Sequence, residues 1–278
     1  MKQLFDEVSY KSSKITTETY STSFSFGILA LHKSIRKSIY NIYGFVRFAD
    51  EIVDSFHDYE KANLFIKYKA DTFTAIEEKI SLNPILNSFQ ETVNTYNIDL
   101  KLITHFLDSM EMDLRKKNYN KENYTNYIHG SAEVVGLMCL NVFVNGNKLL
   151  YNKLTPYAMS LGSAFQKINF LRDVNVDYFL LGRNYFPDVE MKSFSKEDKT
   201  TIEEDIEKDF KNALLGIKLL PDSSRGGVYL SYLYYYHLLR KIKSLPAHRV
   251  LEERISIPNT KKLYLMFKAI SKNKLNII

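Results

Sequence analysis

The sequence predicts an all-α protein, and three observations support this fold class. The 278 residues include only 6 prolines and 10 glycines, so few positions interrupt a helix. The long segments between them carry apolar residues at intervals of three and four, the period of an amphipathic helix. Strand-like alternation bounded by turn residues is almost absent. No linker, change of composition or tandem repeat divides the chain, so we expect one domain over 1–278.

The expected helical segments are 9–31, 34–56, 61–80, 84–118, 124–146, 155–180, 196–211, 229–243 and 247–278. The first contains a Ser/Thr-rich stretch, Thr16–Ser25, whose hydroxyls suit either helix N-capping or the binding of an anion. Segments 61–80 and 84–118 place their charges on polar faces, so we interpret them as scaffold, with Pro84 suited to a helix start. We assign three acidic side chains of 84–118 to the surface: Asp108, Glu111 and Asp113.

Small residues gather in segment 124–146, at Gly130, Ser131, Ala132 and Gly136. They permit close approach by another helix or by a bulky apolar ligand, and both interpretations stay open. His129, a lone histidine, is more typical of a core or capping residue than of a catalyst.

The last third of the chain is predicted to begin with a charged surface helix at 196–211. Ser223–Gly227 is interpreted as a loop and 229–243 as a tyrosine-dense helix. Segment 247–278 is basic and amphipathic, which fits either a helix lying on a membrane face or a packed terminal helix with a solvated lysine side.

Composition limits the classes of function. The net charge is +6, but no basic cluster is interleaved with aromatic residues, so we expect no nucleic-acid partner. A basic surface favours an anionic membrane or a diphosphate substrate. Cys139 is the only cysteine and lies in an apolar run, so we expect a buried, inert thiol and a cytoplasmic protein. No signal peptide or spanning segment is expected, which leaves peripheral contact with a membrane.

One acidic motif lies on the helix at 34–56. Asp50 and Asp54 are four residues apart and share a face with Arg47, while Glu51 lies on the flank of that face. A solvated acidic turn is the usual interpretation of such a pair. Here apolar side chains cover the helix almost all round, including Tyr43, so a functional pair is favoured.

A second polar stripe runs along the helix at 155–180. Gln166, Asn169, Asp173 and Asp177 recur at intervals of three and four, on a single face. The neighbouring residues are apolar enough to bury most of the helix. Because buried carboxylates need a cation or a charged partner, we expect this stripe to bind something. The loop that follows, 182–187, presents Arg183 close to it.

These side chains predict the chemistry of the ligand. Carboxylates and amides without His or Cys select Mg²⁺ or Mn²⁺, and Mg²⁺ is commonly completed by substrate phosphates. Arg47, Arg172 and Arg183 suit phosphate oxygens, and no Gly-rich nucleotide loop occurs. A diphosphate leaving from an allylic carbon would leave a carbocation, which needs a dry, aromatic cavity. The aromatic residues next to the stripes are Phe24, Phe26, Tyr43, Phe45, Phe48, Tyr127, Phe165 and Phe170.

With these motifs in place, the sequence resembles the squalene/phytoene synthase family, most closely its bacterial phytoene synthases. The resemblance covers about Ser9 to Leu265. It is carried by these segments: Ser21–Phe24, Tyr43–Asp54, Tyr127–Gly136, Gln166–Asp177 and Arg183–Pro187. Glu51 stands where many members have a second Asp, and Ile128 and Glu133 replace a frequent Cys and Gly.

The resemblance implies an all-α isoprenoid synthase bundle with a central cavity. It implies a transferase that joins two prenyl diphosphates head to head (1′–1), through a cyclopropylcarbinyl diphosphate. The implied Mg²⁺ ligands are Asp50, Asp54, Asn169, Asp173 and Asp177, with Glu51 in support. The residues implied to contact the diphosphates and substrate chains are Tyr20, Ser21, Thr22, Ser23, Tyr43, Arg47, Gln166, Arg172 and Tyr235, and we add Phe24, Tyr127 and Arg183 from their places in the motifs.

The expected substrate is geranylgeranyl diphosphate, and the expected product is phytoene, the entry to carotenoids. The alternative within the family is squalene or dehydrosqualene from two farnesyl diphosphates; only squalene formation needs NADPH. An alternative of another class is a non-catalytic helical assembly factor with the same fold. The retained Asp50, Asp54, Asp173 and Asp177 argue against it.

Overall fold

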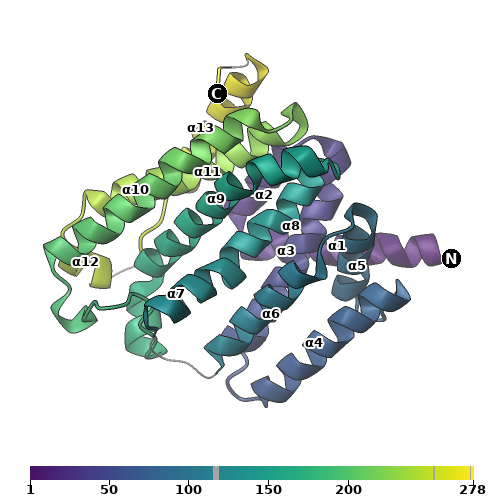
Figure 1. Ribbon diagram of the computed structural model, residues 1–278, viewed down its shortest axis with the longest axis horizontal. Helices are drawn as coiled ribbons and strands as arrows, with labels where there is room; N and C mark the ends of the chain where they lie inside the picture. Colours follow the sequence, from purple (N-terminus) through teal and green to yellow (C-terminus); the bar gives the residue numbers. More distant parts are fainter. Residues whose placement is uncertain (115–118, 253, 276) are drawn as a thin grey trace.

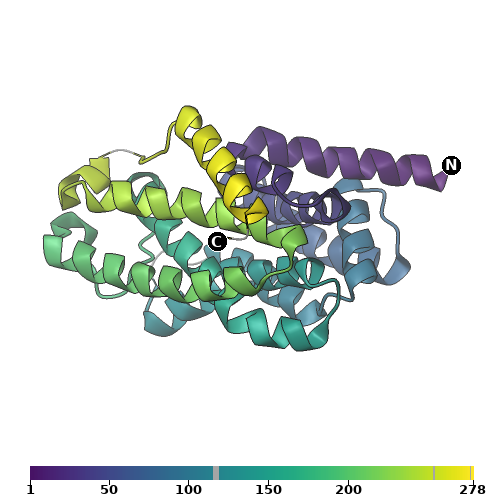
Figure 2. The same cartoon turned by 90° about the horizontal axis from the view of Figure 1, so that it is seen from above.

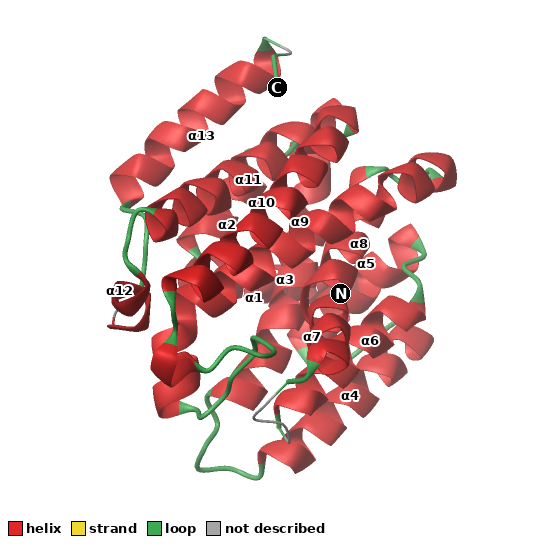
Figure 3. Ribbon diagram, turned by 60° about the vertical axis from the view of Figure 1, so that its left-hand side comes forward, coloured by secondary structure: helices red, strands yellow, loops and turns green. Residues whose placement is uncertain are grey.

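The computed structural model describes residues 1–114, 119–252, 254–275 and 277–278 (Figure 1). Within these ranges the chain forms helices and connecting loops and has no strand, so the predicted all-α class is confirmed (Figure 3). The α-helices are α1 (Lys2–Tyr20), α2 (Thr22–Leu29), α3 (Lys33–Asp54), α4 (Lys61–Glu78), α5 (Pro84–Tyr96), α6 (Leu100–Asp113), α7 (Lys121–Ile128), α8 (Val134–Phe143), α9 (Lys148–Val174), α10 (Lys196–Leu219), α11 (Asp222–Lys243), α12 (Ala247–Glu252) and α13 (Asn259–Lys274). Short helices of other types are the π-helical η1 (His129–Glu133) and η2 (Asn175–Leu180) and the 3₁₀ turn η3 (Met191–Ser193).

Two helices organise the bundle. Helix α9 packs against α8, α10 and α11, and α3 packs against α1, α5 and α8. The core between the helices is rich in phenylalanine: Phe45 of α3 stacks on Phe89 of α5 with ring centroids 3.8 Å apart, and neither side chain is exposed. Figure 2 shows α1 along the outside of the bundle, with the N-terminus at one end.

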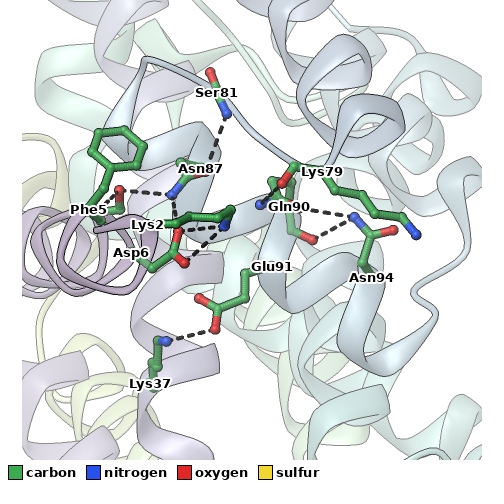
Figure 4. A network of polar contacts seen from close by, with 11 residues as sticks. Lys2, Phe5, Asp6, Lys37, Lys79, Ser81, Asn87, Gln90, Glu91 and Asn94 are labelled. Carbon is green, nitrogen blue, oxygen red and sulfur yellow. Dashed lines mark hydrogen bonds and ion pairs between the residues drawn. The ribbon is translucent and has the colours of Figure 1, made fainter.

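A polar network holds α1 and α5 together (Figure 4). The Asn87 amide donates to Asp6 Oδ1 and to Ser9 Oγ, both at 3.0 Å, and its Oδ1 accepts from the Ser81 backbone at 3.3 Å. On the next turn of α5, Gln90 donates to the Lys79 carbonyl at 3.0 Å. Asn87 therefore fixes α1 against α5, and Gln90 fixes the end of α4.

Several predicted segments are divided where capping residues interrupt them. Segment 9–31 is two helices broken at Ser21, and the first starts earlier, at Lys2. Segment 84–118 is broken at Asn97, whose φ of 50° is left-handed and ends α5. The end of that prediction, 115–118, lies outside the described residues. Segment 247–278 divides into α12 and α13.

The predicted loop at 223–227 is wrong, because these residues form the first turns of α11. Pro221 directly precedes the helix, where the absence of its N–H costs nothing. A Cβ at Gly227 would lie 2.6 Å from the Gly27 carbonyl oxygen of α2. The glycine therefore allows two helices to approach closely and does not mark a turn.

The helix predicted at 155–180 begins earlier and changes its form at the end. Asn147 caps α9, accepting from the Leu150 backbone at 3.0 Å, and the helix runs through Pro156. From Asn175 the winding widens into η2, a π-helical turn of the kind often found at functional sites. The helix predicted at 196–211 continues to Leu219.

Candidate active site

A cavity of about 1340 Å³ runs through the bundle between α3 and α9. Its wall includes both Asp173 and Leu154 of α9. These residues are 19 positions apart, which at 1.5 Å per residue is about 28 Å along the helix. The cavity is therefore polar near the C-terminal end of α9 and apolar towards its N-terminal end.

The structure brings nearly all the predicted site residues to this one cavity. Those that line it are Tyr20, Ser21, Thr22, Ser23, Phe24, Tyr43, Arg47, Asp50, Asp54, Tyr127, Gln166, Asn169, Arg172, Asp173, Asp177, Arg183 and Tyr235. Glu51 is not part of the wall and instead pairs with Arg47. The predicted convergence of the two acidic helices is thus a property of the fold, while the roles of these residues in binding stay predictions.

On α3, one arginine is held by three neighbours. Arg47 donates from Nη1 to Asp50 and from Nη2 to Glu51. The ring of Tyr20 lies 4.3 Å from the guanidinium, a cation–π contact. The Arg47 Nε is buried without a partner among the described atoms. Burial, reinforced by the charge of Asp54, raises the pKa of Asp50 to about 7, although Arg47 opposes this shift.

On α9, Asp173 is bound by two arginines. Arg172 donates from Nε at 3.0 Å, and Arg254, from the loop before α13, donates at 2.8 Å. One α-helical turn earlier, Asn169 Oδ1 accepts from the Tyr235 hydroxyl at 3.2 Å. Arg254 lies in no recognisable sequence motif. Only the fold brings it to Asp173.

The two acidic helices face each other closely enough to interact. Burial first, and then the charges of Asp173 and Asp54, raise the pKa of Asp177 to about 7. Asp54 belongs to α3 and Asp177 to η2, so this effect crosses the cavity. Arg183 Nη1 donates to Asp54 Oδ1 at 2.8 Å and partly offsets the repulsion.

The assignment of Asp113 to the surface is wrong. Its side chain is buried, whereas Asp108 and Glu111 pair with Lys69 nearer the surface as expected. Asp113 accepts from the hydroxyls of Tyr119 at 2.6 Å and Tyr127 at 2.5 Å, and from that of Tyr185 at 3.4 Å. Its backbone carbonyl accepts from Arg183 at 3.4 Å.

The sequence did not reveal Asp113 because its tyrosine partners all lie outside its own helix, at positions 119, 127 and 185. Burial raises the pKa of Asp113 to about 6, against the opposing effects of Arg183 and the tyrosine hydroxyls. Asp113 also lines the cavity. We therefore add it to the candidate site.

The acidic residues of the cavity can be compared with the donors that a divalent cation prefers. Among the described residues, no three His, Cys, Asp or Glu side chains converge as a ready metal-binding group. The donors are nevertheless carboxylate and amide oxygens, which hard cations prefer. The raised pKa values of Asp50 and Asp177 reflect crowded, buried carboxyl groups that a bound cation would neutralise. The chemistry of the donors fits Mg²⁺, and the set of ligands stays a prediction.

Aromatic and small side chains form the apolar part of the wall. Phe165 stacks on Tyr235 at 3.9 Å, and Phe24 lies 5.4 Å from Tyr43. Three of the aromatics expected here do not line the cavity: Phe26, Phe45 and Phe48. Phe45 is in the core beside α5, because it lies on the opposite side of α3 from Asp50.

The small residues of 124–146 are divided between a helix contact and the cavity wall. A Cβ on Gly130 would lie 2.5 Å from the His105 carbonyl of α6, so the helices touch there, whereas Ser131, Ala132 and Gly136 line the cavity. His129 pairs with Glu133 at 2.9 Å, and neither lines the cavity.

Cys139, predicted to be buried, is half-buried and lines the cavity. Burial raises the pKa of its thiol to about 12, which favours the protonated form near neutral pH, so its inertness stays a prediction. Ser21, which had two interpretations, is the N-cap of α2: it accepts from the Phe24 backbone at 3.2 Å while also lining the cavity.

The structure is an all-α bundle whose cavity has a charged end and an aromatic wall. Comparison with known proteins shows the family to which such a bundle belongs. The chain belongs to the squalene/phytoene synthase family, whose model matches residues 17–261. It is 26% identical over 249 residues to the chloroplastic phytoene synthase 1 of Zea mays, covering 82% of this chain and 60% of that protein. It is also 26% identical over 208 residues to the 4,4'-diapophytoene synthase of Staphylococcus haemolyticus, covering 73% and 69%.

Solved structures confirm the fold. A dehydrosqualene synthase superposes with a TM-score of 0.82 at 19% identity, over 97% of this chain and 98% of that one. The squalene synthase HpnC of Alicyclobacillus acidocaldarius gives 0.75 at 19% identity, over 86% and 94%. The predicted isoprenoid synthase bundle is therefore confirmed. No helix in the described part of the chain is both long and apolar enough to cross a bilayer.

Proposed function

We propose that this protein is a prenyltransferase that condenses two prenyl diphosphates head to head, with geranylgeranyl diphosphate as substrate and phytoene as product. The observation that carries the proposal is a continuous cavity that joins arginines and carboxylates at one end to an apolar interior at the other. The membership of the family supports it. The same features argue against a non-catalytic assembly factor, which has no use for carboxyl groups held at a raised pKa.

The polar end suits the two diphosphates. Asp50, Asp54, Asn169, Asp173 and Asp177 would hold Mg²⁺ (or Mn²⁺), which supplies charge neutralisation to a departing diphosphate. Arginine side chains bind phosphate oxygens through paired N–H groups. Arg47, Arg172 and Arg183 already lie at the wall, each oriented by a carboxylate, so a diphosphate would replace those partners without a large rearrangement.

The apolar end suits the carbon skeleton and its cationic intermediates. The rings of Phe24, Tyr43, Phe165 and Tyr235 present aromatic faces within the wall, and such faces stabilise a cation while excluding water. The hydroxyls of Tyr127, Tyr119 and Tyr185 are turned to Asp113, so they are not free to add to a carbocation.

Cavity length favours the C20 substrate. Sixteen carbons run along a geranylgeranyl chain, so its extended length is roughly 20 Å for carbon–carbon bonds of about 1.5 Å. The wall follows α9 for about 28 Å from Asp173 to Leu154, which accommodates this chain beyond the diphosphate. The alternative, two farnesyl diphosphates giving dehydrosqualene or squalene, would leave the far end unfilled. It is kept because one relative is a 4,4'-diapophytoene synthase.

Product analysis tests the proposal. The protein is incubated with geranylgeranyl or farnesyl diphosphate and Mg²⁺, with and without NADPH, and the hydrocarbons are identified by mass. We expect a C40 product that does not require NADPH. Products of C30 alone would overturn the chain length and retain the condensation, whereas the absence of any condensed hydrocarbon would contradict the activity.

A further inference from the structure

Within the described residues, helix α13 carries apolar side chains that stay exposed. It lies along the outside of the bundle (Figure 3), packed on α11, with Leu265 and Ala269 fully buried beneath it. On its outer side Tyr264 is 58% and Phe267 is 61% exposed. These two residues are three apart and share one face. Isolated exposed apolar residues are ordinary, but large neighbouring ones on one face mark an interaction surface.

Positive charges surround these aromatic side chains. Lys261 Nζ lies 5.2 Å from the centroid of the Tyr264 ring, and Lys268 follows Phe267 directly. Burial, and then the charges of Lys261, Arg240 and Lys268, lower the pKa of His237. Because all three cations lie near this histidine, Arg240 of α11 belongs to the same group. We call the set Arg240, Lys261, Tyr264, Phe267 and Lys268 the basic–aromatic patch.

The charge of this patch distinguishes it from the other exposed apolar surface at the ends of the chain. Helix α1 also exposes large apolar residues, yet each of its lysines pairs with an acidic residue four positions away, so its surface is close to neutral. In the part of the chain that the structure describes, neither Lys261 nor Lys268 has an acidic partner. The basic–aromatic patch therefore retains its positive charge.

We propose that the basic–aromatic patch docks the protein on an anionic lipid bilayer. Aromatic side chains insert at the level of the headgroups while lysines and arginines contact their phosphates. A second copy of this chain fits less well, since a two-fold contact would bring the lysines of one patch against those of the other. This proposal rests on the surface of α13 and is independent of the catalytic one.

The patch lies close to the cavity. The loop from Arg254 to Ile257 and Lys262 of α13 form part of the cavity wall, so the patch and the cavity are separated by little more than one helix. Docking would hold the cavity beside the bilayer, where apolar molecules dissolve. Helix α13 thus carries the patch on its outer face and contributes Lys262 to the cavity wall.

Vesicle binding tests this proposal with the full-length protein. Vesicles of phosphatidylcholine alone and vesicles that also contain phosphatidylglycerol are sedimented with the wild type and with the double variant Lys261→Gln/Lys268→Gln. Each lysine near an anionic surface contributes about fivefold in binding, so we expect the double variant to bind the anionic vesicles roughly 30-fold more weakly. Tyr264→Ser/Phe267→Ser should weaken binding at both low and high salt.

The matched controls are Lys148→Gln and Leu149→Ser, at the exposed start of α9, where Leu149 is 85% exposed. Neither should change vesicle binding. Equal binding to neutral and anionic vesicles, or equal binding by the wild type and the patch variants, would overturn the proposal. A dimer of the wild type that the Tyr264→Ser/Phe267→Ser variant abolishes, without vesicle binding, would assign the patch to a second copy and overturn it too. Circular dichroism verifies that every variant is folded.

Discussion

Replacing Asp113 by Asn should make the protein more stable at neutral pH. Asp113 is buried, and burial raises the pKa of its carboxyl group from an ordinary 3.8 to about 6. An ionised Asp113 is therefore held in the fold at a cost in free energy. The amide of asparagine has nearly the same shape, carries no charge and can still accept a hydrogen bond from the hydroxyl of Tyr119 or Tyr127.

The size and the sign of the effect follow from proton linkage. Below pH 3.8 the carboxyl is protonated in both the folded and the unfolded state, so it contributes nothing. Between pH 3.8 and about 6 the folded state retains the proton that the unfolded state releases, and stability falls as the pH rises. Above pH 6 the full penalty is present, about 3 kcal/mol for this difference in pKa. The variant should lack this penalty.

Urea unfolding at several pH values between 3.5 and 8, with a chelator present, measures the effect. The difference between the variant and the wild type isolates Asp113 from the other carboxyl groups. We expect it to grow from near zero to about 3 kcal/mol in favour of the variant. Asp108→Asn, on the same helix but exposed beside Lys69, is the control and should change stability by at most about 1 kcal/mol. A difference that stays constant with pH, or a variant less stable than the wild type at pH 7, would refute the reasoning.

Three further predictions concern the proposed reaction. Asp173→Ala should abolish turnover while circular dichroism shows an unchanged helical content; near-normal turnover would overturn the role in metal binding. Mg²⁺ affinity, measured by calorimetry, should fall as the pH is lowered through 7, because protonated Asp50 and Asp177 cannot bind a cation; an affinity constant from pH 8 to 5.5 would contradict this. Ala158→Phe should shorten the apolar end of the cavity and raise the ratio of C30 to C40 product when both diphosphates are supplied; an unchanged ratio would show that chain length is limited elsewhere.

The sequence alone was sufficient to predict the features that depend on the spacing of residues along a single helix. The pair Asp50 and Asp54, and the stripe from Gln166 to Asp177, lie on one face of α3 and on one face of α9 continued into η2, and both faces line one cavity as expected. This worked because the offsets of three and four residues fix the direction of side chains before any tertiary contact forms. The resemblance to the family then supplied the relation between the two helices.

Features that depend on contacts between separate elements were not predictable in this way. Asp113 looked like a surface acid because nothing within its own helix distinguishes it from Asp108. Its burial depends on hydroxyls that reach it from residues 119, 127 and 185. The loop interpretation of 223–227 fails for the same reason. The small size of Gly226 and Gly227 serves contacts of α11 with α13 and α2, which only the three-dimensional structure shows.

The buried carboxyl groups of this cavity explain why the site would favour a bound cation and diphosphate. Asp50, Asp113 and Asp177 all have raised pKa values, so ionising them within the protein alone is unfavourable. The arginines oppose this only in part, and each arginine that pairs with a carboxylate is also a candidate partner for a diphosphate. Charge is therefore incompletely balanced within the protein itself. Binding a divalent cation together with a diphosphate would complete the balance, and the free energy released on doing so would favour the bound state.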